Sequence, residues 1–382
     1  NIGRIALIDR WDVQLCDELQ DSPASRCVTA QVKTAMESTW RSLLITGGLG
    51  FVGSHLAAAI AAKYPRLKIS VLDQENQSEE AKQKISRLNQ FSNIRIFYGD
   101  VRSVDLLRLL MERTQCDSVI HLAGVTNCTI EASLEFTKTN TIGTHIVLEL
   151  CHHLKVGKFI LISTDAVYGT IVEPEMGEEG RVVLNPSSCY AAAHAAAEMM
   201  TRAYHTSYGL NCNIVRMSNV YGPMQGPEKI VSNFILSILN DLEILIHGDG
   251  TSQRNYLYVE DAVAALDLVL HKGDPGKVYN ANASSSSSRL DVVRVLKDIC
   301  EVMGIDFGAI QWKSTHDRPF NDLRRCVVDP KMAALGWKQQ VSWMEGLKAT
   351  VEWYKANADQ NWGGRAQVIK RLKEHSQHMQ NA

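Results

Sequence analysis

Tyr190 and His194 are the side chains of this 382-residue chain whose types and spacing point most directly to chemistry. They stand in the stretch "CYAAAHAAAE", and side chains four residues apart lie on the same face of a helix. A tyrosine loses its proton, and so becomes available as a base, more readily beside a positive charge, because the charge stabilises the phenolate. An ordinary histidine, with a pKa of about 6.5, is mostly neutral at pH 7 and gives a phenol of pKa about 10 little such help.

The glycine-rich stretch "TGGLGFVG" at residues 46–53 is a second chemical candidate. It follows the apolar run "SLLI" and opens the helix-like "SHLAAAIAAKY", so free N–H groups at a helix N-terminus are expected to face a diphosphate. The spaced glycines suit a tight turn, a close approach to the ligand and close helix packing, although a bare structural turn is the alternative. The cofactor-binding residues predicted here are Gly47, Gly50, Phe51, Val52 and Gly53.

Asp73 supports the same interpretation, because it ends the apolar stretch "LKISVLD" about twenty residues further on. A carboxylate at this position accepts hydrogen bonds from a ribose. It would also repel a ribose phosphate, and no arginine follows it directly. The sequence therefore favours NAD over NADP.

The elements that must position these residues alternate between strands and helices from Ser42 to about Trp362. This alternation predicts an α/β fold, a Rossmann doubly wound parallel sheet with a smaller C-terminal substrate lobe and a cleft between them. The strands we expect are residues 42–46, 67–73, 94–100, 118–124, 158–164 and 212–218.

The charge and hydropathy of the chain argue against some partners. A formal net charge of −2 predicts no general attraction to nucleic acid or anionic membranes. The basic segment at 363–380 is expected to be a solvated terminal helix, with a nucleic-acid contact as the alternative. The uncharged run at 43–62 is long enough to span a bilayer, but its glycines and histidine favour a strand, a turn and a buried helix.

The nine cysteines are scattered, odd in number and without a CxxC pair. They predict neither a disulfide scaffold nor a zinc site, and they favour a reducing compartment such as the cytoplasm or the mitochondrial matrix. We expect no secretory signal in the first residues, since they lack a basic stretch followed by an apolar core.

Several ordered motifs resemble the extended short-chain dehydrogenase/reductase family. Besides the glycine stretch they are "YGDV", "HLAG", "TKTNTIGT", "ISTDAVYG" and the tyrosine at 190. The later stretches "RMSNVYGP", "HGDGTSQRNYLYVEDAV" and "DRPFNDLR" look like its nucleotide-sugar 4,6-dehydratase branch, the dTDP-glucose and UDP-glucose dehydratases. The resemblance covers roughly residues 42–362.

This resemblance implies NAD as the cofactor. Together with two helix-like patches before residue 42 and a basic stretch after residue 362, it divides the chain into four parts. They are a helical N-terminal extension at 1–41, an NAD-binding Rossmann domain at 42–225, a partly interleaved nucleotide-sugar lobe at 226–362 and a basic C-terminal tail at 363–382.

The resemblance also implies binding roles at the matching positions. Asp100 and Val101 would border the adenine, and the "HLAG" motif would line the cofactor path beneath the diphosphate through Leu122, Ala123 and Gly124. Cationic groups suit the phosphate oxygens of a nucleotide-sugar, although each one taken alone is equally a surface charge. The substrate-binding residues implied are Asn219, Lys229, Arg254 and Arg318.

Catalytic roles follow in the same way. Tyr190 would take the proton of the sugar 4-hydroxyl while hydride leaves for NAD, and Thr164 would hydrogen-bond the same oxygen. In the dehydratases the next residue, here Asp165, protonates the departing 6-hydroxyl, and a glutamate after it removes the proton at carbon 5. The family places a lysine where His194 stands, and that lysine lowers the tyrosine pKa and holds the nicotinamide ribose.

The chain departs from this pattern at catalytic positions. Ala166 replaces the glutamate, and a methyl group is not a base. His194 replaces the lysine, and Asn127 and Cys128 replace expected residues after "HLAG". Proton abstraction by Tyr190 is therefore expected to be harder, while NAD binding does not need the lost charge.

Three functions remain open at the level of sequence. One is a pseudoenzyme that keeps the NAD site and serves as a structural or NAD-sensing subunit of a larger assembly. The others are a 4,6-dehydratase with a rewired site and an epimerase, for which alanine at 166 is unremarkable. Family members commonly dimerise through the tyrosine helix, here 191–209, so a homodimer or a larger assembly joined through the terminal extensions is expected, with a nucleotide-sugar as substrate if the chain is active.

Overall fold

The computed structural model describes most of the chain from residue 38 onward. The described ranges are 38–74, 78–126, 133–171, 183–283, 288–317, 322–325, 330–357 and 362–381. The predicted N-terminal extension lies outside them except for its last four residues, as do Asn127, Cys128 and Arg318.

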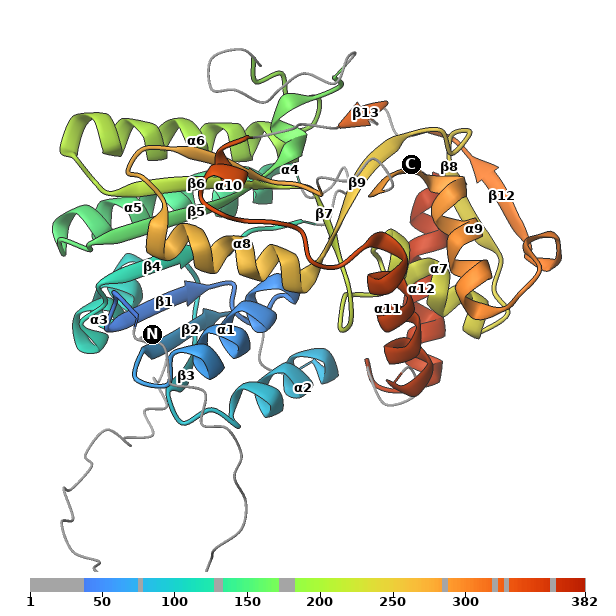
Figure 1. Ribbon diagram of the computed structural model, residues 1–382, viewed down its shortest axis with the longest axis horizontal. Coiled ribbons are helices and arrows are strands. Elements are labelled where there is room, and N and C mark those ends of the chain that lie inside the picture. Colours follow the sequence, from blue (N-terminus) through green and yellow to red (C-terminus); the bar gives the residue numbers. More distant parts are fainter. Residues whose placement is uncertain are drawn as a thin grey trace, which may run out of the picture. The chain divides into compact units, whose positions relative to one another are not determined.

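A seven-stranded parallel sheet forms the first lobe, in the order β10-β6-β5-β4-β1-β2-β3 (Figure 1). Its strands are β1 (Ser42–Thr46), β2 (Lys68–Asp73), β3 (Ile94–Tyr98), β4 (Ser118–His121), β5 (Lys158–Thr164), β6 (Cys212–Met217) and β10 (Val278–Ala281). The order reverses direction between β1 and β4, which is where doubly wound sheets bind ligands. The predicted fold class and all six predicted strands are confirmed, because strands buried on both faces appear as short, nearly continuous apolar runs.

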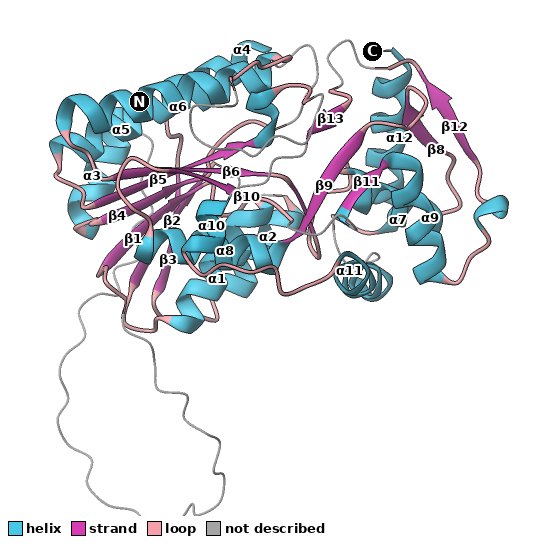
Figure 2. Ribbon diagram, turned by 45° about the horizontal axis from the view of Figure 1, so that its top comes forward, coloured by secondary structure: helices cyan, strands magenta, loops and turns pink. Residues whose placement is uncertain are grey.

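Helices cover both faces of this sheet, as Figure 2 shows. One layer consists of α1 (Phe51–Lys63), α2 (Glu79–Leu88), α8 (Val259–Lys272) and the short α10 (Pro330–Ala334). The other consists of α3 (Val104–Thr114), α5 (Thr144–His153) and α6 (Cys189–Tyr208). Between β4 and β5 the short α4 (Ser133–Glu135) runs into a π-helix, η2 (Phe136–Gly143), and a 3₁₀ turn, η3 (Asp165–Tyr168), follows β5.

The second lobe has its own apolar core, which includes Phe234, Leu296 and Tyr354. Its strands are β7 (Asn219–Tyr221), β8 (Ile244–His247), β9 (Gln253–Tyr258), β11 (Arg289–Asp291), β12 (Trp312–Thr315) and β13 (Arg324–Arg325). Its helices are α7 (Ile230–Leu239), α9 (Val292–Met303), the 3₁₀ turn η5 (Phe307–Ala309), α11 (Trp343–Asn357) and α12 (Arg365–Asn381). Strand β9 pairs with β7, β11 and β13 and so joins most of this lobe.

The basic C-terminal segment forms a helix, as expected, but one stripe of it is buried. Helix α12 buries Val368 and Leu372 in the core of the second lobe. Because these two residues are four positions apart, they form one apolar stripe on an otherwise polar helix. The segment predicted as a basic tail is therefore a packed element of the second lobe.

Two further expectations concern the described ranges. Within them no helix is both long and apolar enough to cross a membrane, and no group of histidine, cysteine and acidic side chains is arranged to hold a metal ion. The cysteines of the same ranges are free thiols, namely Cys116, Cys151, Cys189, Cys212 and Cys300.

Candidate cofactor and catalytic site

The glycine stretch forms the turn between β1 and α1, and its geometry requires glycine. Gly47 has a φ of +67°, and a Cβ there would lie 2.7 Å from the backbone nitrogen of Ala123. A Cβ on Gly53 would collide with the carbonyl oxygen of Gly47. The turn is therefore pressed against both the loop after β4 and its own helix, which brings bare backbone to the ligand side.

The N-terminus of α1 has the features of an anion site. Gly50 is the N-cap and provides no side-chain hydrogen bond to the first turn, which also lacks an acidic residue. The unpaired N–H groups of a first helical turn attract a negative group such as a diphosphate. Phe51 and Val52 occupy this first turn and are half-buried.

Asp73 ends β2 and fixes the glycine turn. Its Oδ2 accepts a hydrogen bond of 2.9 Å from the backbone N–H of Leu49. The carboxylate thus lies beside the turn, where a ribose attached to the diphosphate would be, and it stabilises the turn before any ligand binds. Sequence reasoning assigned Asp73 the first role and missed the second.

The remaining cofactor residues lie at the ends of neighbouring strands. Val101 is buried after β3. Asp100 is ion-paired with Arg102 at 2.6 Å. Partial burial opposes ionisation of this carboxyl, but the hydrogen bonds and charge of Arg102 prevail and lower the pKa of Asp100. A role for Asp100 at the adenine must therefore be shared with Arg102.

The loop after β4 carries Leu122, Ala123 and Gly124. It is held by Thr46, whose carbonyl accepts from the N–H of Leu122 at 3.1 Å and whose hydroxyl accepts from Ala123 at 3.3 Å. A Cβ on Gly124 would come within 3.2 Å of the Asn140 side-chain oxygen. The three predicted residues thus adjoin the glycine turn on one side and η2 on the other.

Asn140, which sequence reasoning did not select, fixes the next part of this loop. Its side chain accepts from the N–H of Val125 at 2.7 Å, donates to the carbonyl of Val125 at 3.0 Å and lies 3.4 Å from His194 Nε2. It stands in the π-helix η2, and such segments often accompany functional sites. Asn140 belongs to the motif "TKTNTIGT", but nothing in the sequence distinguished it from the other residues of that motif.

Tyr190 and His194 are brought together as predicted. Ser188 caps α6 by accepting from the N–H of Ala191, and Tyr190 lies in the first turn. The tyrosine and histidine rings pack edge to face with centroids 4.7 Å apart, and Phe136 contacts Tyr190 from η2 at 5.8 Å.

His194 is buried and neutral. Burial lowers its pKa to about 4, because an imidazolium ion loses its hydration there. Within the part of the chain that the structure describes, Nδ1 of this ring has no hydrogen-bond partner. The side chain therefore brings Tyr190 a polar atom but no charge at pH 7.

The end of β5 presents the other catalytic candidates. The Thr164 hydroxyl accepts from the N–H of Ala166 at 3.2 Å and so caps η3. Asp165 and Ala166 are both buried in this turn, and α6 packs against β5 and η3. A buried methyl group occupies the position after Asp165.

A buried ion pair that sequence reasoning missed ties α6 to the end of β5. Glu198 lies one turn beyond His194, and its carboxylate binds Arg216 of β6 at 2.5 Å and accepts from the Ser163 hydroxyl at 2.6 Å. Arg216 in turn donates to the Tyr168 hydroxyl at 2.6 Å. The helix carrying Tyr190 is thereby fixed to the strand carrying Thr164.

The substrate-side candidates are dispersed over the second lobe. Lys229 is the N-cap of α7, and its ammonium lies 3.4 Å from the carbonyl and hydroxyl oxygens of Thr126, in the loop after β4. Asn219 begins β7 and is half-buried. Arg254 is buried in β9 and donates to the carbonyl of Gln253 at 2.8 Å. The structure thus brings Lys229 to the cofactor loop.

Fold and site together define the class. A doubly wound parallel sheet, a glycine turn opening the first helix, and a tyrosine helix packed on the end of β5 are the features of extended short-chain dehydrogenase/reductases. Residues 44–350 match the family model described as GDP-mannose 4,6 dehydratase. The chain belongs to this family of NAD-dependent nucleotide-sugar dehydratases and epimerases.

Individual relatives agree with this assignment. A trifunctional UDP-glucose 4,6-dehydratase/UDP-4-keto-6-deoxy-D-glucose 3,5-epimerase/UDP-4-keto-L-rhamnose-reductase of Arabidopsis thaliana is 40% identical over 330 residues, 85% of this chain and 48% of that protein. The chain thus spans about half the length of these plant relatives. The dTDP-D-glucose 4,6-dehydratase of Dictyostelium discoideum is 36% identical over 83% of this chain and 82% of its own.

A solved structure shows the same fold with ligands. The dTDP-glucose 4,6-dehydratase DesIV from Streptomyces venezuelae, with NAD and TYD bound, superposes with a TM-score of 0.74 at 31% sequence identity. The match covers 83% of this chain and 97% of the bacterial one. The segment after residue 350, which includes α12, lies outside the family model.

Proposed function

We propose that this chain binds NAD and a nucleotide-sugar but is impaired in 4,6-dehydration, and that it serves as a structural or NAD-sensing subunit of a larger assembly. The observation that carries the proposal is the buried, neutral His194 beside Tyr190. This chain spans about half the length of its plant relatives, so its activity and its partners are both proposed here and are not taken over from those relatives.

The residues around α1 fit NAD. When bound, NAD would supply the acceptor for the hydride that leaves carbon 4 of the sugar. The first turn of α1 would hold its diphosphate and Asp73 a ribose, since the turn is bare of side chains where Gly47 and Gly53 stand. The unpartnered Nδ1 of His194 supports a second ribose contact, because a buried polar atom without a partner is costly unless a ligand satisfies it.

The impairment follows from the electrostatics of Tyr190. With a pKa of about 4, His194 stays neutral at every physiological pH and does not stabilise a phenolate. Tyr190 then takes the proton of the sugar 4-hydroxyl poorly. General base catalysis typically contributes about 10²–10⁴-fold, so the loss is expected to be of that order.

The second half of dehydration is affected independently. Removal of the carbon-5 proton needs a base, and Ala166 provides only a buried methyl group at the position where the dehydratases have a glutamate. Asp165, which the resemblance assigns to protonation of the departing 6-hydroxyl, precedes it. Loss of water from the sugar is therefore expected to be slower than oxidation at carbon 4.

An active enzyme with a rewired site is the second candidate. Tyr190 and Thr164 are both retained, and α6 is fixed to β5. An epimerase needs only oxidation and re-reduction at carbon 4, for which Ala166 is no obstacle. Under this alternative the chain would convert a UDP- or dTDP-sugar into its 4-epimer without loss of water.

The assembly part of the proposal rests on α6. Met199, Met200 and Tyr208 are exposed on this helix, which suits packing against a second copy or another subunit. A reducing compartment, the cytoplasm or the mitochondrial matrix, remains the prediction for its location.

The first experiment incubates the purified chain with NAD and either dTDP-glucose or UDP-glucose and follows the sugar by mass spectrometry and by chromatographic separation of 4-epimers. NAD binding, measured by calorimetry, without loss of water is the expected result. Water loss at an enzymatic rate would refute the impairment, and a 4-epimer alone would select the second candidate. A chain that binds no NAD would refute the proposal as a whole.

A further inference from the structure

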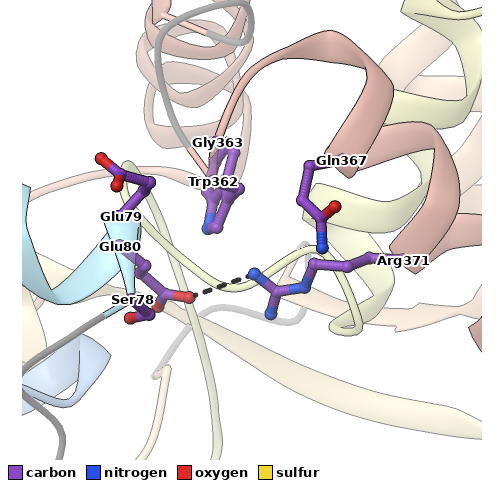
Figure 3. Close-up of a pocket in the computed structure, with 7 residues that line it drawn as sticks. All are labelled: Ser78, Glu79, Glu80, Trp362, Gly363, Gln367 and Arg371. Atoms are coloured by element: carbon purple, nitrogen blue, oxygen red, sulfur yellow. Dashed lines mark hydrogen bonds and ion pairs between the residues drawn. The ribbon is translucent and has the colours of Figure 1, made fainter.

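Arg371, on α12, connects the two lobes at a place that the catalytic site does not include. Its Nη1 lies 3.5 Å from Glu80 Oε2 of α2 (Figure 3). Its Nη2 lies 3.6 Å from Glu228 Oε2, just before α7. We infer that Arg371 is a positioning residue that holds the turn carrying Lys229 against the cofactor lobe. The inference rests on the proposed function, because Lys229 is one of the residues expected to contact the phosphates of the nucleotide-sugar.

Glu80 is a fixed point on the cofactor side. It lies in the first turn of α2, where the helix dipole favours a carboxylate. The buried ammonium of Lys84 binds Glu80 Oε1 at 2.7 Å, so one oxygen is held while the other faces Arg371. Helix α2 follows β2, which ends at Asp73, the predicted ribose contact.

Glu228 belongs to a rigid turn on the substrate side. The Ser232 hydroxyl donates to the carbonyl of Gly226 at 2.6 Å, and the Tyr354 hydroxyl donates to the carbonyl of Gln225 at 2.5 Å. Lys229 follows directly and reaches Thr126. A displacement of Glu228 is therefore expected to move Lys229 rather than be absorbed within the turn.

The junction that Arg371 spans is not filled by apolar packing. A cavity of about 350 Å³ lies there, bordered by Ser78, Glu79, Trp362 and Gln367 as well as the ion pair (Figure 3). A second contact from α2, Arg87 to the Met224 sulfur at 3.4 Å, is a weak hydrogen bond. The Arg371 guanidinium is thus a main contact between α2 and the turn that carries Lys229.

Such a contact couples the binding of NAD to the binding of the nucleotide. NAD favours one position of the cofactor side, a nucleotide favours one position of Lys229, and Arg371 makes these positions depend on each other. Without it, each ligand has less effect on the affinity of the other. Because both ion pairs are partly solvated, the expected change is modest, about threefold to tenfold in coupling.

The test compares Arg371→Gln with Lys370→Gln, a matched control whose ammonium lies 3.8 Å from Glu374 of the same helix. Hydrogen exchange is measured at the backbone of residues 229–233, and TDP and UDP affinities are measured by calorimetry with and without NAD. Arg371→Gln is expected to speed exchange there about threefold or more and to reduce the coupling, whereas Lys370→Gln changes neither. Glu228→Gln should reproduce the effect, and the double variant with Arg371→Gln should add little to it.

Equal hydrogen exchange in Arg371→Gln and the natural chain would overturn the inference. It would also be overturned if Lys370→Gln changed exchange and coupling as much as Arg371→Gln does. If the natural chain binds neither TDP nor UDP, the proposed function fails, while the exchange measurement still decides whether Arg371 positions the turn. A thermal melt of each variant establishes that it is folded before exchange is compared.

Discussion

The proposed impairment rests mainly on the imidazole of His194, which stands where the family has the primary amine of a lysine. His194 occupies the helical position that faces Tyr190, and its burial keeps it neutral. The sequence predicted the facing pair and the weak electrostatic help. It did not reveal that burial lowers the pKa of His194, since that depends on residues such as Asn140 that are remote in sequence.

The first prediction at this scale concerns regained activity. Ala166→Glu together with His194→Lys restores both a carbon-5 base and a charge beside Tyr190. Loss of water from dTDP-glucose or UDP-glucose with NAD, followed by mass spectrometry, should rise about 10²-fold or more over the natural chain. Each single variant should gain less than the pair. An unchanged rate in a folded double variant that binds NAD would show that the site is lost for another reason.

A second prediction isolates the glycine turn. Gly47→Ala places a Cβ against Ala123 in a backbone conformation with φ of +67°. NAD affinity measured by calorimetry should fall about tenfold or more, because the diphosphate loop must shift. Gly209→Ala is the matched control, since Gly209 has a φ of +69° with open space around it. Equal NAD affinity in the two variants would contradict a role for the turn.

At the scale of elements, Glu198 joins α6 to two strands, because its carboxylate pairs with Arg216 of β6 and accepts from Ser163 of β5. The third prediction is that Glu198→Gln lowers the free energy of unfolding by about 3–5 kcal/mol, because it leaves the Arg216 charge buried and uncompensated. Urea unfolding measures this loss. Glu149→Gln, which affects an exposed carboxylate on α5, should change little. A loss below about 1 kcal/mol for Glu198→Gln would mean that water reaches the pair.

Sequence patterns predicted some elements far better than others. Six of the seven strands of the first sheet were predicted, because each is an apolar run of a few residues flanked by polar or small ones. Strands such as β7 and β13 are only three and two residues long and pair with β9 far along the chain, so they carry no local pattern. The burial of α12 likewise depends on a partner surface that its own residues do not specify.

For the whole molecule, buried histidines make stability depend on pH. Burial lowers the pKa of His194 and His55 to about 4 and that of His121 to about 3, from an ordinary 6.5. Between these values the unfolded chain binds protons that the folded chain does not, so stability falls as pH drops below about 6.5. His271 acts in the opposite sense: burial opposes its charging, but hydrogen bonds and charge of Asp267 raise its pKa.

The fourth prediction follows from this balance. The free energy of unfolding should fall by about 2–4 kcal/mol between pH 7 and pH 5.5, as measured by urea titration at several pH values. His271→Gln removes the opposing contribution and should make the fall steeper. A flat profile over this interval would show that these imidazoles titrate in the folded protein as they do in the unfolded chain.

The path of the chain between the lobes has a consequence for modularity. The chain forms β7, α7, β8 and β9 in the second lobe and then α8 and β10 in the first. It returns to the second lobe for β11 and α9 and to the first for α10. Helices α11 and α12 then belong to the second lobe. Neither lobe is formed by one continuous segment of the chain. Exchange of one substrate specificity for another by recombination would need several junctions at once, so variation in this architecture is expected to accumulate by point substitution, as at Ala166 and His194.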